Sequence, residues 1–265
     1  MKKTKIDWAD STWNPVTGCL HGCEYCYAQG IANRFAPSPV LVPDFEWLTP
    51  AGSEPRIYEL GEPVRIESRN NRKEPYPYCF EPTFHRYKLN EPARWTKPRN
   101  IFVCSMADLL GKWVPDEWIK EVFAACEAAP QHRYLFLTKN PARYIELYDK
   151  GLLLEADNMW FGSTATTPET EFFFSKAYNT FLSIEPILKP FHDSLGNGVQ
   201  ACKKTDWIIV GAETGNRKGK AIPDASWIME IVQSAEKADT PVFMKESLRG
   251  IMGDCFRQEF PWEVG

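Results

Sequence analysis

The stretch Asp206-Trp207-Ile208-Ile209-Val210-Gly211 is the clearest of a series of short apolar runs in this 265-residue chain. A short, continuously apolar run that ends in turn or polar residues is typical of a strand in a parallel sheet covered by helices. Five further runs share these properties, at residues 100–105, 133–137, 158–162, 179–183 and 241–244. Together the six runs predict a parallel β-sheet.

Helical patterns separate several of these runs. Between Asp116 and Ala129 five apolar residues recur at helical spacing, namely Trp118, Ile119, Val122, Phe123 and Cys126. Two further stretches, Pro141 to Tyr148 and Ala225 to Ala238, also suit helices. The alternation of strands and helices predicts an α/β fold of the kind found in α/β barrels.

Composition and charge narrow the class of protein. Hydrophobic residues make up 43% and charged residues 25% of the chain, as in globular proteins. The net charge is −4 and the pI about 5.7, so the strong basic excess typical of a nucleic-acid binder is missing, although a local basic patch is compatible with these values. No apolar run approaches the roughly 20 residues of a membrane span, and no signal-peptide core follows the basic start Met1–Lys5. We expect a cytoplasmic protein without a membrane partner.

We expect a single domain over residues 1–265 with an insertion at about residues 30–99. The insertion departs from the strand and helix rhythm and is rich in proline and aromatic residues. Long loops inside compact domains are usually functional or disordered. The sequence therefore predicts an irregular segment that follows the first strand and covers the mouth of the barrel.

The segment Gly18-Cys19-Leu20-His21-Gly22-Cys23-Glu24-Tyr25-Cys26-Tyr27 contains three cysteines with C-x3-C-x2-C spacing. Soft thiolates select iron–sulfur clusters or zinc, and the two glycines allow the loop to curl. Three ligands rather than four leave one iron of a four-iron cluster open to a cofactor or substrate. The other five cysteines are scattered, which favours core or surface positions over a disulfide framework: Cys79, Cys104, Cys126, Cys202 and Cys255.

This spacing, with Tyr25 as the aromatic residue before the last cysteine, resembles the signature of the radical S-adenosylmethionine (SAM) superfamily. The resemblance implies a partial (β/α) barrel, a [4Fe–4S] cluster held by Cys19, Cys23 and Cys26, and SAM at the open iron with Tyr25 near its adenine. It also implies an enzyme that cleaves SAM reductively to a 5′-deoxyadenosyl radical. A reductant such as flavodoxin or ferredoxin would then be a partner.

A second set of motifs resembles an uncharacterised, bacteriophage-associated protein family. The opening residues 6–19 carry the first motif, and the others cover most of the chain: Trp95–Arg99, Ile101–Asp108, Leu137–Lys139, Leu182–Pro186 and Val210–Gly215. That family brings no reaction with it. Its phage association, together with basic stretches at residues 94–99 and 215–220, favours a nucleotide or nucleic acid as substrate, whereas the acidic pI argues against one.

Small or polar residues end all six of the predicted strands. In a barrel these ends converge on one mouth, where functional residues gather. With the radical SAM resemblance, five of them become candidates for contacts with the cofactor or substrate: Ser105, Asp108, Ser183, Glu185 and Glu213. Three others are candidates for substrate contacts or carboxylate pairing: Thr138, Lys139 and Lys245. Helix caps and structural ion pairs are the competing interpretations.

Structural zinc is the alternative for the three cysteines. His21, between Cys19 and Cys23, would complete a Cys3His set, or a distant cysteine would be the fourth ligand. The protein would then be a zinc-stabilised, non-catalytic binding module of phage origin. No second short pair of Cys or His residues accompanies the triad in the sequence, which favours the cluster. Metal identity separates the two hypotheses, because iron with acid-labile sulfide supports the enzyme and zinc supports the module.

Overall fold

The computed structural model describes residues 4–36, 56–66, 70–191, 197–215 and 217–263. The chain divides into two compact units. The N-terminal unit is Ser11–Tyr134, and the C-terminal unit combines Met1–Asp10 with Leu135–Gly265. Among the described helices, none has both the length and the apolar character that crossing a membrane requires.

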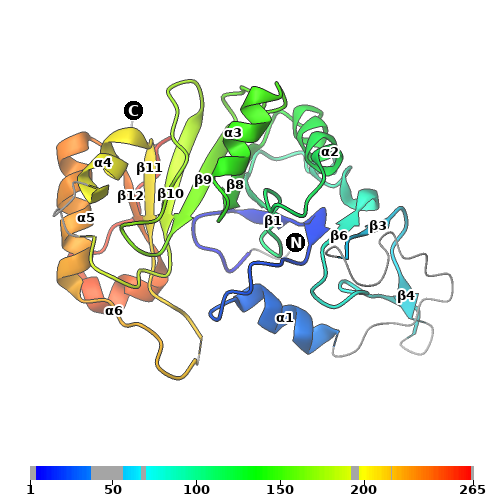
Figure 1. The fold of residues 1–265 in the computed structure, drawn as a ribbon, viewed down its shortest axis with the longest axis horizontal. Helices are drawn as coiled ribbons and strands as arrows, with labels where there is room; N and C mark the ends of the chain where they lie inside the picture. The colour runs from blue at the N-terminus through cyan, green and yellow to red at the C-terminus, as the bar shows by residue number, and fades with distance from the viewer. Residues whose placement is uncertain (1–3, 37–55, 67–69, 192–196, 216, 264–265) are drawn as a thin grey trace. The chain divides into compact units, whose positions relative to one another are not determined.

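Seven strands form the main sheet, in the order β1-β7-β8-β9-β10-β11-β12 (Figure 1). Their bounds, in that order, are Ser11–Trp13, Asn100–Val103, Arg133–Thr138, Met159–Ala165, Asn179–Ile184, Trp207–Val210 and Val242–Met244. β1 pairs with β7 in parallel, as do β9 with β10, β10 with β11 and β11 with β12. From β7 onward each strand lies beside its successor in the chain, whereas a doubly wound sheet would reverse its order partway. The predicted fold class, a partial (β/α) barrel, is confirmed.

The helices follow the prediction where apolar periodicity is strong. Three match it closely: α2 Asp116–Glu127, α3 Ala142–Asp149 and α5 Ala225–Ala238. Three lie where the sequence predicts none: α1 Tyr27–Phe35, α4 Asn197–Lys204 and α6 Arg249–Met252. α6 has only four residues, and the buried side chains among the described ones of α4 are Ala201 and Cys202. Helical periodicity becomes clear over about 11 residues or more, and these helices have at most nine.

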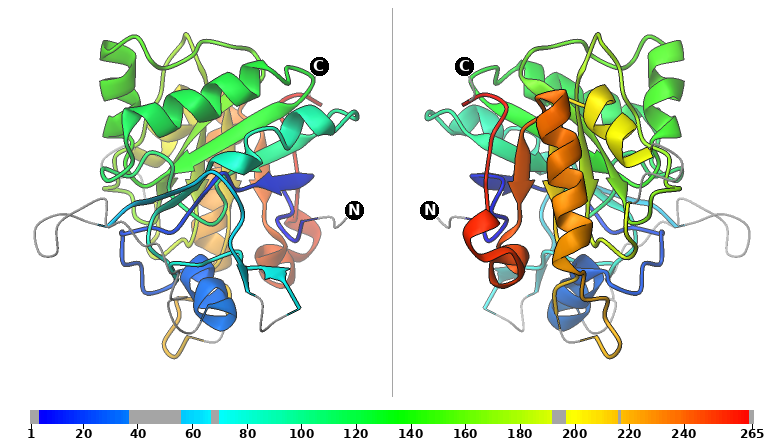
Figure 2. Two further views of the ribbon diagram at one scale, coloured as in Figure 1. Left: turned by 90° about the vertical axis from the view of Figure 1, so that its right-hand side faces the viewer. Right: turned by 90° about the vertical axis from the view of Figure 1, so that its left-hand side faces the viewer.

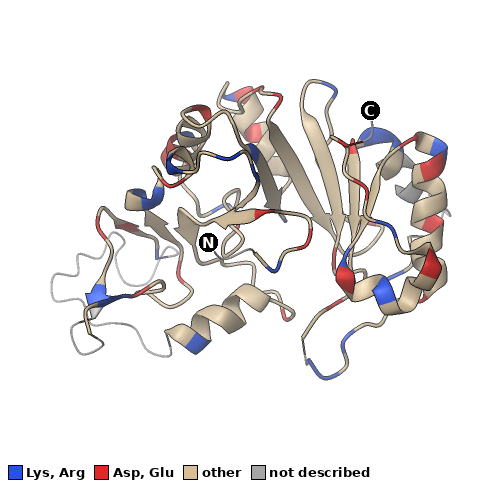
Figure 3. Cartoon of the chain, turned by 180° about the vertical axis from the view of Figure 1, so that it is seen from behind, with Lys and Arg blue, Asp and Glu red and all other residues tan. Residues whose placement is uncertain are grey.

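The strands of the C-terminal unit pack on both faces, because side chains alternate along a strand. On one face Leu182, Ile208 and Val242 join the buried cluster of α4 and α5, and α5 runs along the strands (Figure 2). The other face is aromatic, with the rings of Phe181 and Trp207 5.7 Å apart. Away from the sheet, α5 carries exposed charges of both signs (Figure 3). The continuous apolar runs of the sequence therefore reflect strands that are covered on both faces.

Short elements organise the described part of the insertion, which follows β1 as predicted. α1 Tyr27–Phe35 comes first, and a small sheet has the order β2-β6-β3, with bounds Val16–Thr17, Thr83–His85 and Tyr58–Leu60. β4 Arg65–Ile66 pairs with β5 Arg72–Lys73 in a separate ribbon, and two 3-10 turns cover Arg86–Lys88 and Pro92–Arg94. The rest of the described insertion is irregular. Residues 37–55 and 67–69, which the prediction also covers, lie outside the described ranges.

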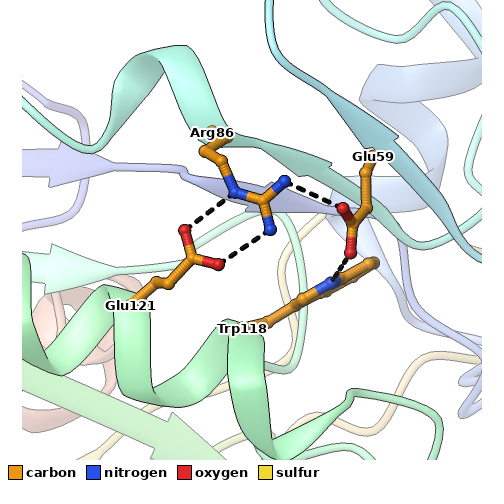
Figure 4. A network of polar contacts seen from close by, with 4 residues as sticks. All are labelled: Glu59, Arg86, Trp118 and Glu121. Atoms are coloured by element: carbon orange, nitrogen blue, oxygen red, sulfur yellow. Dashed lines mark hydrogen bonds and ion pairs between the residues drawn. The ribbon is translucent and has the colours of Figure 1, made fainter.

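A polar network ties this small sheet to α2 (Figure 4). The Arg86 guanidinium donates from Nε and Nη2 to the two Glu121 oxygens, at 2.8 and 2.7 Å, and from Nη1 to Glu59 at 2.9 Å. Trp118 Nε1 donates to the other Glu59 oxygen at 2.6 Å, and its ring stacks on Phe84 at 5.2 Å. A planar guanidinium suits such a fork, so the network fixes where α2 lies on the small sheet.

Candidate functional site

Backbone contacts on two sides hold the start of the cysteine loop. The Gly18 N–H donates to the Met106 carbonyl at 2.9 Å, and the Cys19 N–H donates to the Phe80 carbonyl at 3.2 Å. Gly18 has φ +85°, and a Cβ built there would lie 2.2 Å from the Glu81 carbonyl oxygen. Only glycine fits this position without displacing the backbone. The residues after β7 and before β6 therefore clamp the first cysteine in place.

The three thiols are close enough to influence one another. Burial, first of all, raises the pKa of Cys19 to about 12, and the charges of Asp108, Cys26 and Cys23 add to the increase. A hydrogen bond from the His21 backbone N–H to the Cys19 sulfur acts in the opposite direction. Without a metal Cys19 is therefore a neutral thiol at physiological pH. Because only thiolates ligate metals, binding must release its proton.

Cys26 occupies the N-cap position of α1. Its sulfur accepts a hydrogen bond from the Gln29 N–H at 3.3 Å, and its own N–H donates to the Cys23 carbonyl at 3.1 Å. The turn over residues 23–26 and the first turn of α1 therefore set the direction of the last cysteine.

The donor chemistry fits an iron–sulfur cluster. Within the described ranges, no three His, Cys, Asp or Glu side chains are gathered tightly enough to hold one metal ion. Thiolates that share one tetrahedral zinc lie about 3.8 Å apart, as zinc–sulfur bonds of about 2.3 Å require. A four-iron cluster places each thiolate on a different iron and so accepts wider spacing. Three neighbouring soft donors on one loop suit such a cluster.

His21 and Asp108 are hydrogen-bonded to each other. His21 Nε2 donates to Asp108 Oδ2 at 2.7 Å, and the Leu110 N–H donates to Asp108 Oδ1 at 3.0 Å. The His21 ring also meets the Trp113 ring at 4.9 Å in an edge-on arrangement. Asp108, a candidate for the amino group of SAM, thus has protein partners for both carboxylate oxygens. Its cofactor role stays a prediction, and the contact with His21 is a feature that the sequence did not indicate.

Ser105 lies beside Tyr27, just after the last cysteine of the loop, and its role toward SAM stays a prediction. Its hydroxyl donates to Asn14 Oδ1 at 3.2 Å, and this amide oxygen also accepts from the Met106 N–H at 2.9 Å. The Tyr27 hydroxyl donates to the Ser105 carbonyl at 2.6 Å. The predicted adenine neighbour, Tyr25, is half-buried in the same unit. Asn14 and Tyr27 had no signal in the sequence beyond their closeness to β1 and Cys26.

In the C-terminal unit, an ion pair joins the ends of β10 and β12. Lys245 Nζ donates to Glu185 Oε1, and both side chains are about one-fifth exposed, at 18% and 23%. Glu185, Gly211 and Lys245 each directly follow the last paired residue of β10, β11 and β12. A Cβ on Gly211 would lie 2.8 Å from Lys245 Cδ and 3.2 Å from Glu185 Cδ. The ion pair therefore passes over β11 at a point where only glycine leaves room.

Other predicted residues of this unit differ in how their polar groups are satisfied. Arg217 donates to both Glu213 oxygens, at 2.6 and 2.8 Å, and this hydrogen bonding holds the pKa of Glu213 below its ordinary value. The Thr138 hydroxyl accepts from the Asn140 N–H at 2.9 Å, as in a turn cap. Lys139 follows it at the end of β8. The roles of all three toward SAM or a substrate stay predictions.

Ser183 is the exception. Its side chain is on the same face of β10 as Glu185, two residues along the strand, and it is 1% exposed. No group among the described residues forms a hydrogen bond with its hydroxyl. Buried hydroxyls are rarely left in this state. Among the described residues, the Ser183 hydroxyl therefore leaves its hydrogen-bonding capacity unused.

Comparisons with known proteins find similar solved structures and one matching family model. Spore photoproduct lyase complexed with dinucleoside spore photoproduct is 11% identical, with a TM-score of 0.48 and coverage of 92% of this chain and 79% of that chain. A mutant of spore photoproduct lyase is 12% identical, with a TM-score of 0.45 and coverage of 92% and 81%. No curated protein matches the sequence. The family model described as "Protein of unknown function (DUF5131)" matches residues 3–250, and because this is nearly the whole chain, the protein belongs to that family.

Proposed function

We propose that this protein is a radical SAM enzyme that holds one [4Fe–4S] cluster through Cys19, Cys23 and Cys26. The observation that carries the proposal is the C-x3-C-x2-C spacing on one loop. Its geometry supports it, because the loop starts at a clamped glycine and ends at a helix N-cap. Three thiols within electrostatic range of each other, on a loop with defined ends, provide ligands for three irons and leave the fourth open.

When bound, the cluster would supply the electron that cleaves SAM into methionine and a 5′-deoxyadenosyl radical. The residues of the chain would bind the cluster and SAM, orient them and shield the site. Cys19 loses its proton on binding, and the positive charge of iron offsets the burial that disfavours its thiolate. The half-buried ring of Tyr25 provides an apolar surface for the adenine.

Polar groups for SAM and for the substrate come from the carboxyl ends of the strands. Ser105 is the proposed neighbour of SAM in the N-terminal unit, since it is tied to both Asn14 and Tyr27. In the C-terminal unit Ser183 offers an unused hydroxyl and the Glu185–Lys245 pair offers a carboxylate and an ammonium. We assign these three to polar contacts with SAM or with the substrate.

A nucleotide or nucleic acid is the proposed substrate class, and a flavodoxin or ferredoxin the proposed reductant. The support is the resemblance to phage-associated sequences and the exposed cations Arg94 and Lys97. Other cations of the two basic stretches have structural partners: Arg99 stacks on Trp95 at 4.8 Å, and Arg217 pairs with Glu213. Charge reversal at residues 94 and 97 should lower affinity for a single-stranded oligonucleotide at low salt. Unchanged affinity would remove this support.

Anaerobic reconstitution tests the enzyme proposal. The protein should bind about four irons and four sulfides per chain, as a cubane requires, and release 5′-deoxyadenosine when it is reduced with SAM. Cys19→Ala, Cys23→Ala and Cys26→Ala should each abolish both results. Cys79→Ala, which changes a half-buried cysteine of the same unit, is the matched control and should retain them. One tight zinc per chain, with SAM left intact, would refute the proposal and support the binding module.

A further inference from the structure

We infer that His21 and Asp108 form a latch that holds the middle of the cysteine loop in place before any cluster binds. The inference deepens the proposed function, on which its purpose rests. It assigns His21 as a positioning residue and gives Asp108 a role different from contact with SAM. His21 lies in the C-x3-C part of the motif, two residues after Cys19 and two before Cys23. Because His21 lies midway between the two cysteines, a contact made by its side chain restrains the stretch that joins them.

The acceptor side of the latch is rigid. Asp108 is buried, with 7% of its side chain exposed, and its two carboxylate oxygens accept from His21 Nε2 at 2.7 Å and from the Leu110 N–H at 3.0 Å. The Gly111 N–H donates to the Asp108 carbonyl at 3.1 Å. One backbone N–H thus holds the carboxylate and another closes the turn that carries it, so the carboxylate is in a defined position for His21. A charge-assisted bond in so buried a place is among the stronger protein hydrogen bonds.

Trp113 confines the His21 ring from a second direction. The two rings meet at 4.9 Å with an interplanar angle of 76°. Trp113 itself is pressed onto the backbone, since a Cβ on Gly111 would lie 2.4 Å from Trp113 Cζ2. Asp108 therefore fixes one edge of the imidazole, and the indole limits how far the ring can tilt.

The latch acts where the loop would otherwise be free to move. Gly22 has φ +67° with open space around it, and Leu20 is 38% exposed, so these neighbours do little to restrain the chain. His21 links this stretch to Cys19 as well, because its backbone N–H hydrogen-bonds the Cys19 sulfur. Ordering a loop costs entropy at the moment of binding, and a loop ordered in advance avoids that cost. The latch thus preorganises the first two ligands.

Alkylation of the reduced, metal-free protein tests the latch directly. The rates at Cys19, Cys23 and Cys26 would be measured by peptide mass spectrometry for wild type, His21→Ala, Asp108→Ala and the double variant. Alkylation would be followed as a function of pH and compared as the rate of the thiolate, because removal of the Asp108 charge by itself lowers the pKa of Cys19. Loss of a hydrogen bond to a charged group should raise this Cys19 rate about tenfold in each single variant. Because both changes break one contact, the double variant should react no faster than the singles. Leu20→Ala, in the same loop but outside the latch, is the matched control and should react like wild type.

A second readout links the latch to cluster retention. After reconstitution, iron should leave to a chelator about tenfold faster from both single variants than from wild type or Leu20→Ala. Each metal-free variant should still unfold cooperatively, with a thermal midpoint no more than about 6 °C below wild type, which separates positioning from a loss of fold. If Asp108→Ala unfolds, Asp108→Asn keeps the side-chain size and replaces it.

Two results would overturn the latch: wild-type alkylation rates in both single variants, or effects of the two variants that add in the double. A wild-type protein that binds no iron would refute the proposed function instead. In that case the alkylation rates still decide whether His21 and Asp108 hold the loop.

Discussion

Three glycines of one segment should respond to alanine in three different ways. At Gly18 the new Cβ would lie 2.2 Å from the Glu81 carbonyl oxygen, and the residue has φ +85°. At Gly22 φ is +67° but nothing lies within 4 Å, and Gly30, inside α1, also has open space around its Cβ position. The series therefore separates a steric clash with the backbone from the cost of positive φ alone.

The magnitudes follow from these geometries. Positive φ costs alanine about 1–2 kcal/mol, which is the whole effect expected for Gly22→Ala. Gly18→Ala adds an overpacking cost of about 1–3 kcal/mol, because a carbonyl group on the main chain must move. Gly30→Ala should stabilise the protein by about 0.5–1 kcal/mol, since alanine is the better helix former.

Thermal unfolding and urea titration of the metal-free proteins would measure the series. At about 2–4 °C per kcal/mol for a chain of this size, Gly18→Ala should melt roughly 2–12 °C below Gly22→Ala, and Gly30→Ala should melt slightly above wild type. A Gly18→Ala midpoint equal to that of Gly22→Ala would show that the clamp on the loop yields easily. The description of the loop base as rigid would then be wrong.

Three further predictions concern single contacts. Gly211→Ala should displace the Glu185–Lys245 pair and lower the free energy of unfolding by about 1–3 kcal/mol, as measured by urea titration. A loss below about 0.5 kcal/mol would mean that the lysine side chain moves aside without cost. Burial lowers the pKa of His85 to about 3, below its unfolded value of about 6.5, so stability should fall by about 1.4 kcal/mol per pH unit as the pH drops from 6.5 toward 3. His85→Gln should flatten that part of the stability profile, and an unchanged slope would assign it to other groups. Arg86→Lys should lose the forked contacts but, since the side chain is 41% exposed, cost less than about 1 kcal/mol by urea titration; a larger loss would mean that the network does more than fix α2.

Local signals were sufficient for the strands and the long helices. A run such as Trp207–Val210 is apolar without interruption because both faces of the sheet are covered, and this shows in the sequence. α5 was predictable because Ile228, Ile231, Val232 and Ala235 recur at helical spacing on its buried side. α4 has only eight residues, fewer than the roughly 11 over which helical periodicity becomes clear, and it was not predicted.

The candidate site divides in the same way. The three cysteines could be proposed as ligands from the sequence, because their C-x3-C-x2-C spacing on one loop is a local pattern. The ion pair between Glu213 and Arg217 could also have been predicted from the sequence, since the two residues are only four apart. Contacts between His21 and Asp108, or between Glu185 and Lys245, were not, because 87 and 60 residues separate the partners.

The sequence by itself determined the fold class and supplied the hypothesis of a three-cysteine ligand set, because periodicity and spacing are properties of neighbouring residues. Tertiary structure decided which of the predicted polar side chains have partners. Asp108 accepts a hydrogen bond from His21, whereas the hydroxyl of Ser183 is buried and has no partner among the described residues. It also decided why Gly18 and Gly211 must be glycines, since the atoms that exclude a Cβ come from distant segments. The physical reason is that strand register and chain crossings, which no local pattern encodes, bring these atoms together.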